Sequence, residues 1–496
     1  MNPLRRLAGQ TAIYGLSSIV GRLINFLLVP LYTRVFLPGE YGVVTIMYTY
    51  VAVLLIVLTY GMETAYFRFA EQNPEQKNKV FSTTLLSVLF TSSLFILVVM
   101  LWRQDLATVM RYPDNVEYIV WIGLIIGMDA LAAIPFARLR AENKPLRFVV
   151  IRLAGIAVNI SLVLFFLLLC PWLMENAGDT VRQYVTYIYK PEIGVGYVFI
   201  ANLIASSVTL LLLSPVMRQV RTKPDPVLLR KMLIYALPLL VAGLAGWVNE
   251  ALDKLLLKFL LPEETAMSQV GIYGAVYKLA IMMTIFIQAF RFAAEPFFFA
   301  QAKQKDAKQT YAQVMNYFVI ACLTIFLGIT LFIDVVKHFI GPQYHEGLIV
   351  VPILLLANLF LGIYFNLSIW YKLTGKTYYG AWFSVIGAVV TILLNLWWIP
   401  IVGYYGSAWA TLICYFSLAM LSYLFGQKHY RIPYQLIRNL LMISFAILIF
   451  LISFFTAGIP TTLMYVVHLF LLGLFLMVSI ATDSSLRTGI KSFMRF

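Results

Sequence analysis

The chain has 496 residues, of which 61% are hydrophobic and only 12% are charged. An ordinary soluble domain is roughly 45–50% apolar and about 25% charged, so the composition excludes a soluble globular protein and favours one embedded in a bilayer. The net charge of +15 does not indicate nucleic-acid binding. Its Lys and Arg residues are concentrated in alternate short segments between apolar stretches, as membrane topology requires.

Fourteen apolar stretches follow one another along the chain, each long enough to cross the hydrocarbon core as a helix. Gly and Pro mark many of the breaks between them, for example at Leu37-Pro38-Gly39-Glu40. The alternating segments typical of an outer-membrane barrel are absent. We therefore predict an all-α polytopic membrane protein with fourteen transmembrane helices, near residues 10–33, 41–66, 80–102, 118–137, 148–170, 194–216, 232–257, 270–298, 311–334, 347–371, 378–398, 403–425, 437–457 and 462–481.

The charges between these stretches predict the orientation of the chain. The N-terminus, the even-numbered loops and the C-terminus carry most of the Lys and Arg residues outside the helices, and the segment 217–231 is the richest. By the positive-inside rule both termini are cytoplasmic, as an even number of spans requires. The N-terminus resembles the start of a signal peptide, but no Ala-x-Ala cleavage site follows, so we predict an uncleaved first helix.

The sequence repeats itself weakly. Tyr41-Gly42 recurs as Tyr273-Gly274, and at the same offset Glu63 aligns with Glu295. Both halves begin on the cytoplasmic side and contain six spans, which predicts two parallel lobes with a substrate path between them. The predicted parts are an N-lobe (1–216), a basic cytoplasmic linker (217–231), a C-lobe (232–425), and two further helices with a cytoplasmic tail (426–496).

Ten charged side chains fall inside the predicted spans. A charge at mid-bilayer costs about 2.5–3.5 kcal/mol on insertion scales, so such residues usually face a protein interior or a water-filled path. Five are basic and five are acidic: Arg22, Arg152, Lys254, Lys278 and Arg291, and Glu63, Asp129, Glu250, Asp253 and Glu295.

Depth separates three of these residues from the rest. Arg22 and Asp129 lie near the centres of the first and fourth spans, and Lys278 lies well inside the eighth. A planar guanidinium and a compact ammonium together suit an anionic headgroup. Asp129 is predicted to take up a proton or to exchange sodium, and the alternative is that it serves as a fixed partner for a cationic neighbour.

The remaining buried charges have local explanations of equal weight. Arg152 can extend to the cytoplasmic interface, Glu63 ends its span near that face, and Arg291 with Glu295, like Glu250 with Lys254, has the i,i+4 spacing of a helix pair. With these alternatives open, the candidate substrate-binding residues are Arg22, Lys278, Arg152 and Arg291. The candidate ion-coupling residues are Asp129, Glu63, Glu250, Asp253 and Glu295.

Nothing in the sequence indicates catalysis or a metal site. The cysteines at 170, 322 and 414 show no CxxC spacing, and no two of the four histidines are spaced as metal ligands. The longest outside loop, 171–193, contains neither His nor Cys, so we predict no catalytic residues. No cofactor is expected beyond a coupling H⁺ or Na⁺.

The first sixty residues resemble the start of polysaccharide transport family proteins, within the multidrug/oligosaccharidyl-lipid/polysaccharide superfamily. The resemblance is carried by Gly21-Arg22 and by the segment Arg34-Val-Phe-Leu-Pro-Gly-Glu-Tyr-Gly42. It implies a flippase that moves undecaprenyl-diphosphate-linked oligosaccharides across the bacterial inner membrane by alternating access, through an outward-opening V with a central cationic cavity. Arg22 matches the first-helix arginine of related flippases.

The same resemblance implies the partners. They are a lipid-linked oligosaccharide for O-antigen, capsule or exopolysaccharide assembly, the bilayer itself, and a polysaccharide polymerase with a chain-length regulator. A monomer is expected, and nucleic acid is not. Two alternatives share the fold: a lipid II flippase, and a cation-coupled multidrug exporter, whose cavity should favour acidic residues. A membrane polymerase or ligase would need a catalytic loop outside the membrane.

Overall fold

A computed structural model describes residue 23 and residues 26–72, 74–220, 223–302, 304–456 and 458–482. These residues form helices and no strands, which confirms the all-α prediction. The described part contains 13 helices long and apolar enough to cross a membrane, and each overlaps one of the last thirteen predicted spans. The predicted first span, 10–33, falls largely outside the described residues, and α2 (Val29–Val35) is its described end.

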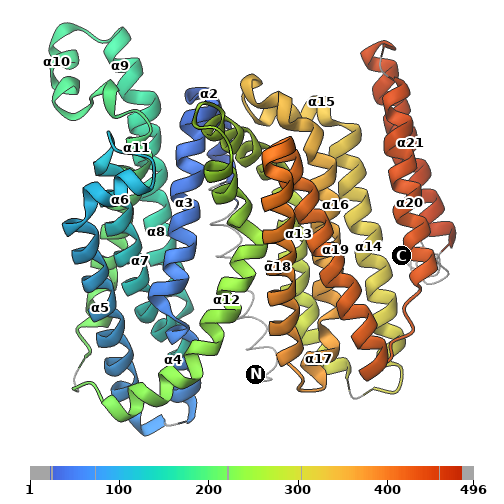
Figure 1. Cartoon of the computed structure of the whole chain (residues 1–496), viewed down its shortest axis with the longest axis horizontal. Helices are drawn as coiled ribbons and strands as arrows, with labels where there is room; N and C mark the ends of the chain where they lie inside the picture. The colour runs from blue at the N-terminus through green and yellow to red at the C-terminus, as the bar shows by residue number, and fades with distance from the viewer. Residues whose placement is uncertain are drawn as a thin grey trace. The chain divides into compact units, whose positions relative to one another are not determined.

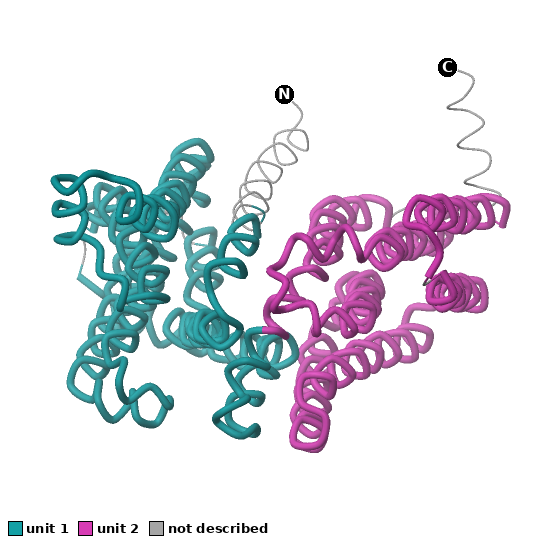
Figure 2. Tube along the Cα trace, turned by 90° about the horizontal axis from the view of Figure 1, so that it is seen from above, with its two compact units in different colours: residues 1–271 teal, residues 272–496 magenta. Residues whose placement is uncertain are grey.

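The chain divides into two compact units, residues 1–271 (unit 1) and 272–496 (unit 2), shown in Figure 2. The boundary lies within α13 (Glu263–Gln301) rather than in the basic segment 217–231. The reason is that α12 (Pro226–Leu260), which the repeat assigns to the second lobe, packs on helices of unit 1. The two lobes of the repeat stay a prediction, whereas the two units follow from the contacts.

Unit 1 is built around α7 (Val116–Ala141), which contacts α3, α4, α5, α8 and α11 (Figure 1). Of the apolar window of α7, 67% is buried, the largest share among the described candidate spans, so this helix faces protein more than lipid. The other helices of the unit that cross or flank the membrane are α3 (Pro38–Thr59), α4 (Met62–Gln72), α5 (Lys77–Leu101), α6 (Arg103–Val109), α8 (Pro145–Leu164), α11 (Gly196–Met217) and α12.

The turn before α3 explains the Leu-Pro-Gly-Glu-Tyr-Gly segment physically. Pro38 occupies the first helical turn, where no hydrogen-bond donor is needed. The Leu37 backbone N–H donates to Glu40 Oε2 at 2.8 Å. A Cβ on Gly42 would lie 2.1 Å from the Met267 carbonyl oxygen. Glycine therefore lets the start of α3 touch the backbone at the start of α13.

The outside loop predicted at 171–193 is largely helical. It contains most of α9 (Cys170–Asn176), all of α10 (Asp179–Ile188) and a single 3-10 turn at Pro191–Ile193. The α9 helix continues α8 through a π-helical turn at Phe165–Leu169. The loop is thus an ordered hairpin of helices attached to one end of unit 1 (Figure 1).

Unit 2 has a layered helical core. Helix α19 packs on both α16 and α18, and α14 packs on α16 and on the two last described helices (Figure 1). Its elements are the rest of α13, α14 (Ala307–Leu331), α15 (Ile333–Val336), a 3-10 segment at Pro342–Val350, α16 (Val351–Leu367), α17 (Ile369–Leu373), α18 (Tyr378–Val402), α19 (Tyr404–His429), α20 (Leu436–Ser453) and α21 (Thr461–Thr482).

Candidate functional site

Asp129 belongs to a polar network inside unit 1. The Ser206 hydroxyl donates a hydrogen bond of 2.8 Å to Asp129 Oδ1, which joins α11 to α7. One turn before Ser206, Asn202 Oδ1 lies 3.5 Å from the same hydroxyl, and Asn202 Nδ2 donates to the Tyr48 hydroxyl of α3 at 3.0 Å. Residues of three helices, α3, α7 and α11, thus form one network that contains a single carboxyl group.

Small residues bring the helices of this network together. Gly155 of α8 has no Cβ, and one added there would lie 2.3 Å from Thr209 Oγ1 of α11.

Arg152, three residues earlier on α8, interacts with Asp129 by charge, and its guanidinium carbon lies 5.9 Å from the Phe136 ring centre. Arg152 is exposed. The cationic neighbour considered for Asp129 is therefore present, although the hydrogen bond comes from Ser206.

The chemistry of this network suits a proton or a small hard cation. Carboxylate, hydroxyl and amide oxygens are the ligands that such cations prefer. Among the described residues no group of three or more His, Cys, Asp or Glu side chains is arranged to hold a metal ion. Asp129 is the one carboxyl group of the network. A single bound proton or monovalent cation would therefore neutralise its charge.

Glu63 forms an ion pair with Arg140, from the far end of α7. The neighbouring Arg138 is buried, and it donates to Glu142 Oε1 at 2.6 Å while its guanidinium lies 4.1 Å from the Phe81 ring centre. Glu63 thus has a partner 77 positions away, which favours the structural alternative for this residue. No pattern in the sequence indicated this partner, because the predicted span ended at residue 137.

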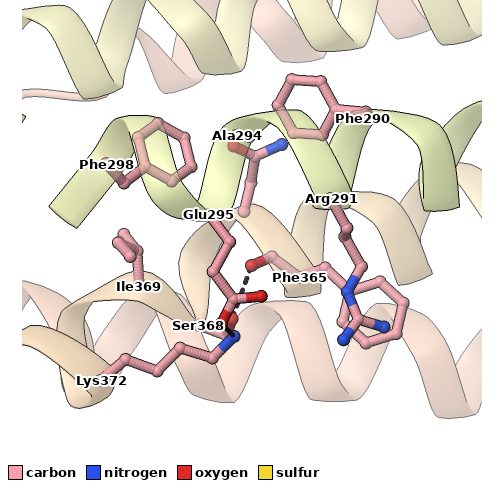
Figure 3. A pocket seen from close by; sticks show the side chains of 10 residues that line it. Phe290, Arg291, Ala294, Glu295, Phe298, Phe365, Ser368, Ile369 and Lys372 are labelled. Atoms are coloured by element: carbon pink, nitrogen blue, oxygen red, sulfur yellow. Dashed lines mark hydrogen bonds and ion pairs between the residues drawn. The ribbon is translucent and has the colours of Figure 1, made fainter. Parts of the chain in front are cut away.

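A small hollow in unit 2 contains two of the candidate charges (Figure 3). Its volume is about 20 Å³, which is room for a water molecule and not for a larger ligand. Glu295 Oε1 accepts a hydrogen bond from Lys372 Nζ at 2.7 Å. Arg291 points away from this pair, and its guanidinium carbon lies 4.1 Å from the Phe365 ring centre (Figure 3). The i,i+4 pair expected between Arg291 and Glu295 is replaced by a pair between α13 and α17.

The α12 charges also pair differently from the expected i,i+4 pattern. Lys254 Nζ lies 3.1 Å from Asp253 Oδ1, and both side chains are buried. Glu250 is exposed. Adjacent positions on a helix point about 100° apart, so sequence spacing alone disfavoured this contact, and the long lysine side chain makes it possible. Lys278 is half-buried on the part of α13 that belongs to unit 2.

The sequence prediction missed two buried cations among the described residues, Arg138 and Lys258. Lys258 is 2% exposed; it donates to the Met110 carbonyl, and its ammonium lies 3.5 Å from the Tyr112 ring centre. Arg111 lies beside it and donates to the Lys258 carbonyl at 3.1 Å. The predicted helix ended at residue 257, whereas α12 continues to Leu260. A longer apolar window would have included this lysine.

The candidates are therefore distributed over both units. Asp129, Arg152, Glu63, Glu250 and Asp253 lie in unit 1, and Lys278, Arg291 and Glu295 lie in unit 2. Within unit 1 Asp129 and Arg152 lie near enough to interact by charge; within unit 2 Arg291 and Glu295 line one hollow. Arg22, the predicted first-helix substrate ligand, lies outside the described residues.

Comparisons with known proteins add the following. Residues 7–301, more than half of the chain, match the family described as "Polysaccharide biosynthesis protein". No curated protein matches the chain. The fold is similar to that of the lipid II flippase MurJ in an inward closed conformation, with a TM-score of 0.66 and 14% identity, covering 94% of this chain and 97% of that one.

Two further solved structures have the same fold. An outward-facing multidrug resistance MATE family transporter of the MOP superfamily has a TM-score of 0.58 and 13% identity, covering 85% of this chain and 95% of that one. The Vibrio cholerae MATE transporter VcmN in the bent form has a TM-score of 0.52 and 14% identity, with 86% and 98% covered. Together with the family match, these structures confirm the resemblance carried by the first sixty residues.

Proposed function

Because the chain belongs to the polysaccharide biosynthesis protein family, we propose that it is a flippase for an undecaprenyl-diphosphate-linked oligosaccharide. It moves this cargo across the bacterial inner membrane by alternating access, and the cargo serves O-antigen, capsule or exopolysaccharide assembly. The observation that carries the proposal is the family match over residues 7–301, on a chain whose fold resembles that of a lipid flippase.

Basic residues within apolar helices would bind the diphosphate of the cargo. Arg22, Lys278, Arg152 and Arg291 are the candidates. The guanidinium of Arg291 lies against the Phe365 ring. Stacking of this kind orients the plane of a guanidinium and leaves its N–H groups available for an oxyanion. Glu295, the acidic residue that lines the same hollow, is already paired with Lys372.

Asp129 is the leading candidate for coupling transport to H⁺ or Na⁺. The Ser206 hydroxyl at 2.8 Å and the nearby Asn202 amide supply further oxygen atoms for a bound cation or for a proton on the carboxyl group. Glu63, Glu250, Asp253 and Glu295 are weaker candidates. The ion pairs of Glu63 with Arg140 and of Glu295 with Lys372 give these two residues a structural role.

We also propose where the protein works and what it works with. The protein works in the inner membrane with both termini in the cytoplasm, as the loop charges predict. It acts as a monomer and passes its cargo to a polysaccharide polymerase and a chain-length regulator. An enzymatic role is disfavoured, because the solved structures that share the fold are named as a flippase and as transporters.

A lipid II flippase is the second candidate, and the likeness to MurJ over 94% of the chain supports it. Lipid II has the same polyprenyl-diphosphate group, so the cationic residues fit both cargoes. A multidrug exporter fits less well, since cationic drugs would be repelled by deep Arg and Lys residues.

Gene deletion followed by analysis of the accumulated lipid distinguishes the two cargoes. A lipid-linked oligosaccharide should accumulate, with loss of surface glycan and normal growth. Accumulation of lipid II with a growth defect would favour the second candidate instead. Complementation with Arg22→Ala should fail to restore surface glycan at normal protein level, whereas Arg103→Ala, at an exposed position of α6, should restore it.

A further inference from the structure

The α9–α10 hairpin belongs to the first half of the chain, and the repeat predicts no counterpart in the second half, where helix 12 follows helix 11 closely. It also exposes more large apolar and aromatic side chains than a water-facing hairpin should. Trp172 is 58% exposed, Tyr184 is 68% exposed and Ile188 is 62% exposed. Exposed apolar groups gathered in one place mark an interaction surface.

The length of the helix that carries the hairpin indicates where this surface lies. From Pro145 to Asn176 the chain runs through α8, the π-helical turn and α9 as one helical span of 32 residues. At 1.5 Å per residue this span is about 48 Å long, whereas the hydrocarbon core is about 30 Å thick. Lys144 and Arg147 flank its start, as expected at a membrane interface. The last turns therefore extend into the headgroup region on the opposite side.

The end of helix α10 is held near the place where the Pro145–Asn176 span leaves the hydrocarbon core. The Tyr189 ring, just after α10, stacks on Tyr197 with ring centres 5.2 Å apart, and Tyr197 stacks on Phe166 at 4.4 Å. The Lys190 backbone N–H donates to the Tyr197 hydroxyl at 2.6 Å. The end of α10 is thus fixed beside the π-helical turn. Its ten residues span about 15 Å, more than the roughly 5–8 Å that one headgroup region adds to the hydrocarbon core.

The side chains of α10 are divided between two faces. Val181, Tyr184, Val185 and Ile188 have the i, i+3, i+4, i+7 spacing of one apolar stripe. Val185 is buried against the protein, but the other three are exposed. The opposite side carries Arg182, Gln183 and Thr186, and Tyr187, which is 76% exposed, lies between the two faces. The protein therefore covers only one edge of the stripe.

The spanning helix below has an exposed apolar surface of its own. Leu164, Leu168 and Trp172 follow at i, i+4 and i+8, and they are 40%, 48% and 58% exposed. On a helix that crosses the bilayer, such a row faces lipid, with acyl chains along the hydrocarbon core and headgroups beyond it. Helices α9 and α10 contact each other, so Trp172 and the exposed stripe of α10 belong to one hairpin.

We propose that the α9–α10 hairpin is a membrane-interface anchor that rests on the leaflet at this end of unit 1, the outer leaflet by the predicted topology. Lipid covers Val181, Tyr184 and Ile188 at the boundary between headgroups and acyl chains. Trp and Tyr are the residues favoured at that depth, and amphipathic helices bind there through such stripes. The hairpin then fixes the depth of α8 in the bilayer.

Depth measurement in nanodiscs of phosphatidylethanolamine and phosphatidylglycerol tests the proposal. Spin labels are placed one at a time through Tyr184→Cys and Ile188→Cys, and through Gln183→Cys and Thr186→Cys as matched controls on the same helix. The three native cysteines are buried and can remain. The ratio of accessibility to oxygen over a water-soluble nickel complex should be several-fold higher at 184 and 188 than at 183 and 186.

Two outcomes overturn the proposal. One is equal nickel accessibility on both faces, which means that water covers the stripe. The other is protection of 184 and 188 from both reagents, which means that protein covers it. Hydroxyl-radical footprinting of the unsubstituted protein in the same nanodiscs removes any effect of the substitutions. Tyr184 and Ile188 should be modified several-fold less in nanodiscs than in a denatured reference, and equal modification contradicts the anchor. Neither readout depends on the identity of the transported cargo.

Discussion

Lys372 Nζ lies 2.7 Å from Glu295 Oε1, although 77 positions separate the two residues in the chain. The contact joins α17 to α13 within unit 2. It gives Glu295 a different partner from Arg291, which the i,i+4 spacing on α13 favoured. Arg291 lies over the Phe365 ring instead. The two charges of one helical turn therefore have separate roles in the structure.

We predict that Glu295 and Lys372 are energetically coupled. Glu295→Gln and Lys372→Met should each lower the unfolding temperature, and the double substitution should lower it by less than the sum. A coupling of about 1 kcal/mol is expected for a partly exposed pair. Thermal unfolding of the purified protein in one detergent measures the cycle. The Glu295→Gln and Arg291→Met cycle serves as the control, and stronger coupling there would contradict the observed pairing.

The Asp129 network makes a prediction about coupling. Asp129→Asn should remove the response of transport in proteoliposomes to an imposed pH or sodium gradient, because an amide cannot change its charge. Ser206→Ala should weaken the response by about tenfold or more, since a hydrogen bond to a charged group contributes about 1.5–3 kcal/mol. Fluorescent-cargo flipping at fixed gradients gives the measurement.

Ser207→Ala is the matched control for that experiment. Ser207 is adjacent on α11, but its hydroxyl donates to the Leu203 carbonyl of its own helix at 2.8 Å. Its removal should leave the gradient response unchanged. If Asp129→Asn retains a full response to both gradients, Asp129 is not the coupling residue.

The contact between α3 and α13 predicts that alanine substitutions at two glycines differ strongly in their effect on stability. A Cβ on Gly271 would lie 1.8 Å from the Pro38 carbonyl oxygen, whereas nothing lies within 4 Å of one on Gly39. Gly271→Ala should therefore destabilise the protein by about 3 kcal/mol or prevent its accumulation, because neither backbone can yield. Gly39→Ala should be neutral or slightly stabilising. Unfolding temperature and membrane yield report both, and equal effects would contradict the close approach.

Asp225 predicts a pH dependence of stability. Lys79 Nζ lies 2.6 Å from its carboxylate, and this hydrogen bond, with that from the Leu228 backbone N–H, holds the pKa of Asp225 below its usual value. A lowered folded-state pKa stabilises the protein above the unfolded pKa of about 4. That stability is lost as the pH falls through the folded value. Asp225→Asn should therefore lower the unfolding temperature at pH 7, by an amount that shrinks below about pH 4.

Asparagine can still cap α12, so the substitution isolates the charge. Unfolding temperatures measured from pH 7 to pH 3 check the prediction. Asp306→Asn is the control, since Asp306 precedes α14 without a side-chain cap hydrogen bond. A temperature difference for Asp225→Asn that is the same at every pH would show that its ion pair does not contribute.

The class of the protein and the order of its spans follow from the sequence alone. Long apolar runs have to become helices in a bilayer, because no water satisfies their backbone groups. For this reason each of the last thirteen predicted spans overlaps a described helix. The Leu37–Gly42 segment was likewise readable, since its proline restricts the backbone locally and favours the start of a helix. It carried the resemblance that the family match confirmed.

Which charges meet depends instead on how the helices pack. Glu63 pairs with Arg140 and Glu295 with Lys372, each across 77 positions, and Asp129 accepts its hydrogen bond from Ser206 on another helix. Local spacing predicts contacts within one helix, but these contacts depend on how neighbouring helices rotate and shift against each other. That register is set by packing at small residues such as Gly155 and Gly271. No local periodicity encodes it, and contacts with α3, α4 and α5 place α12 in unit 1.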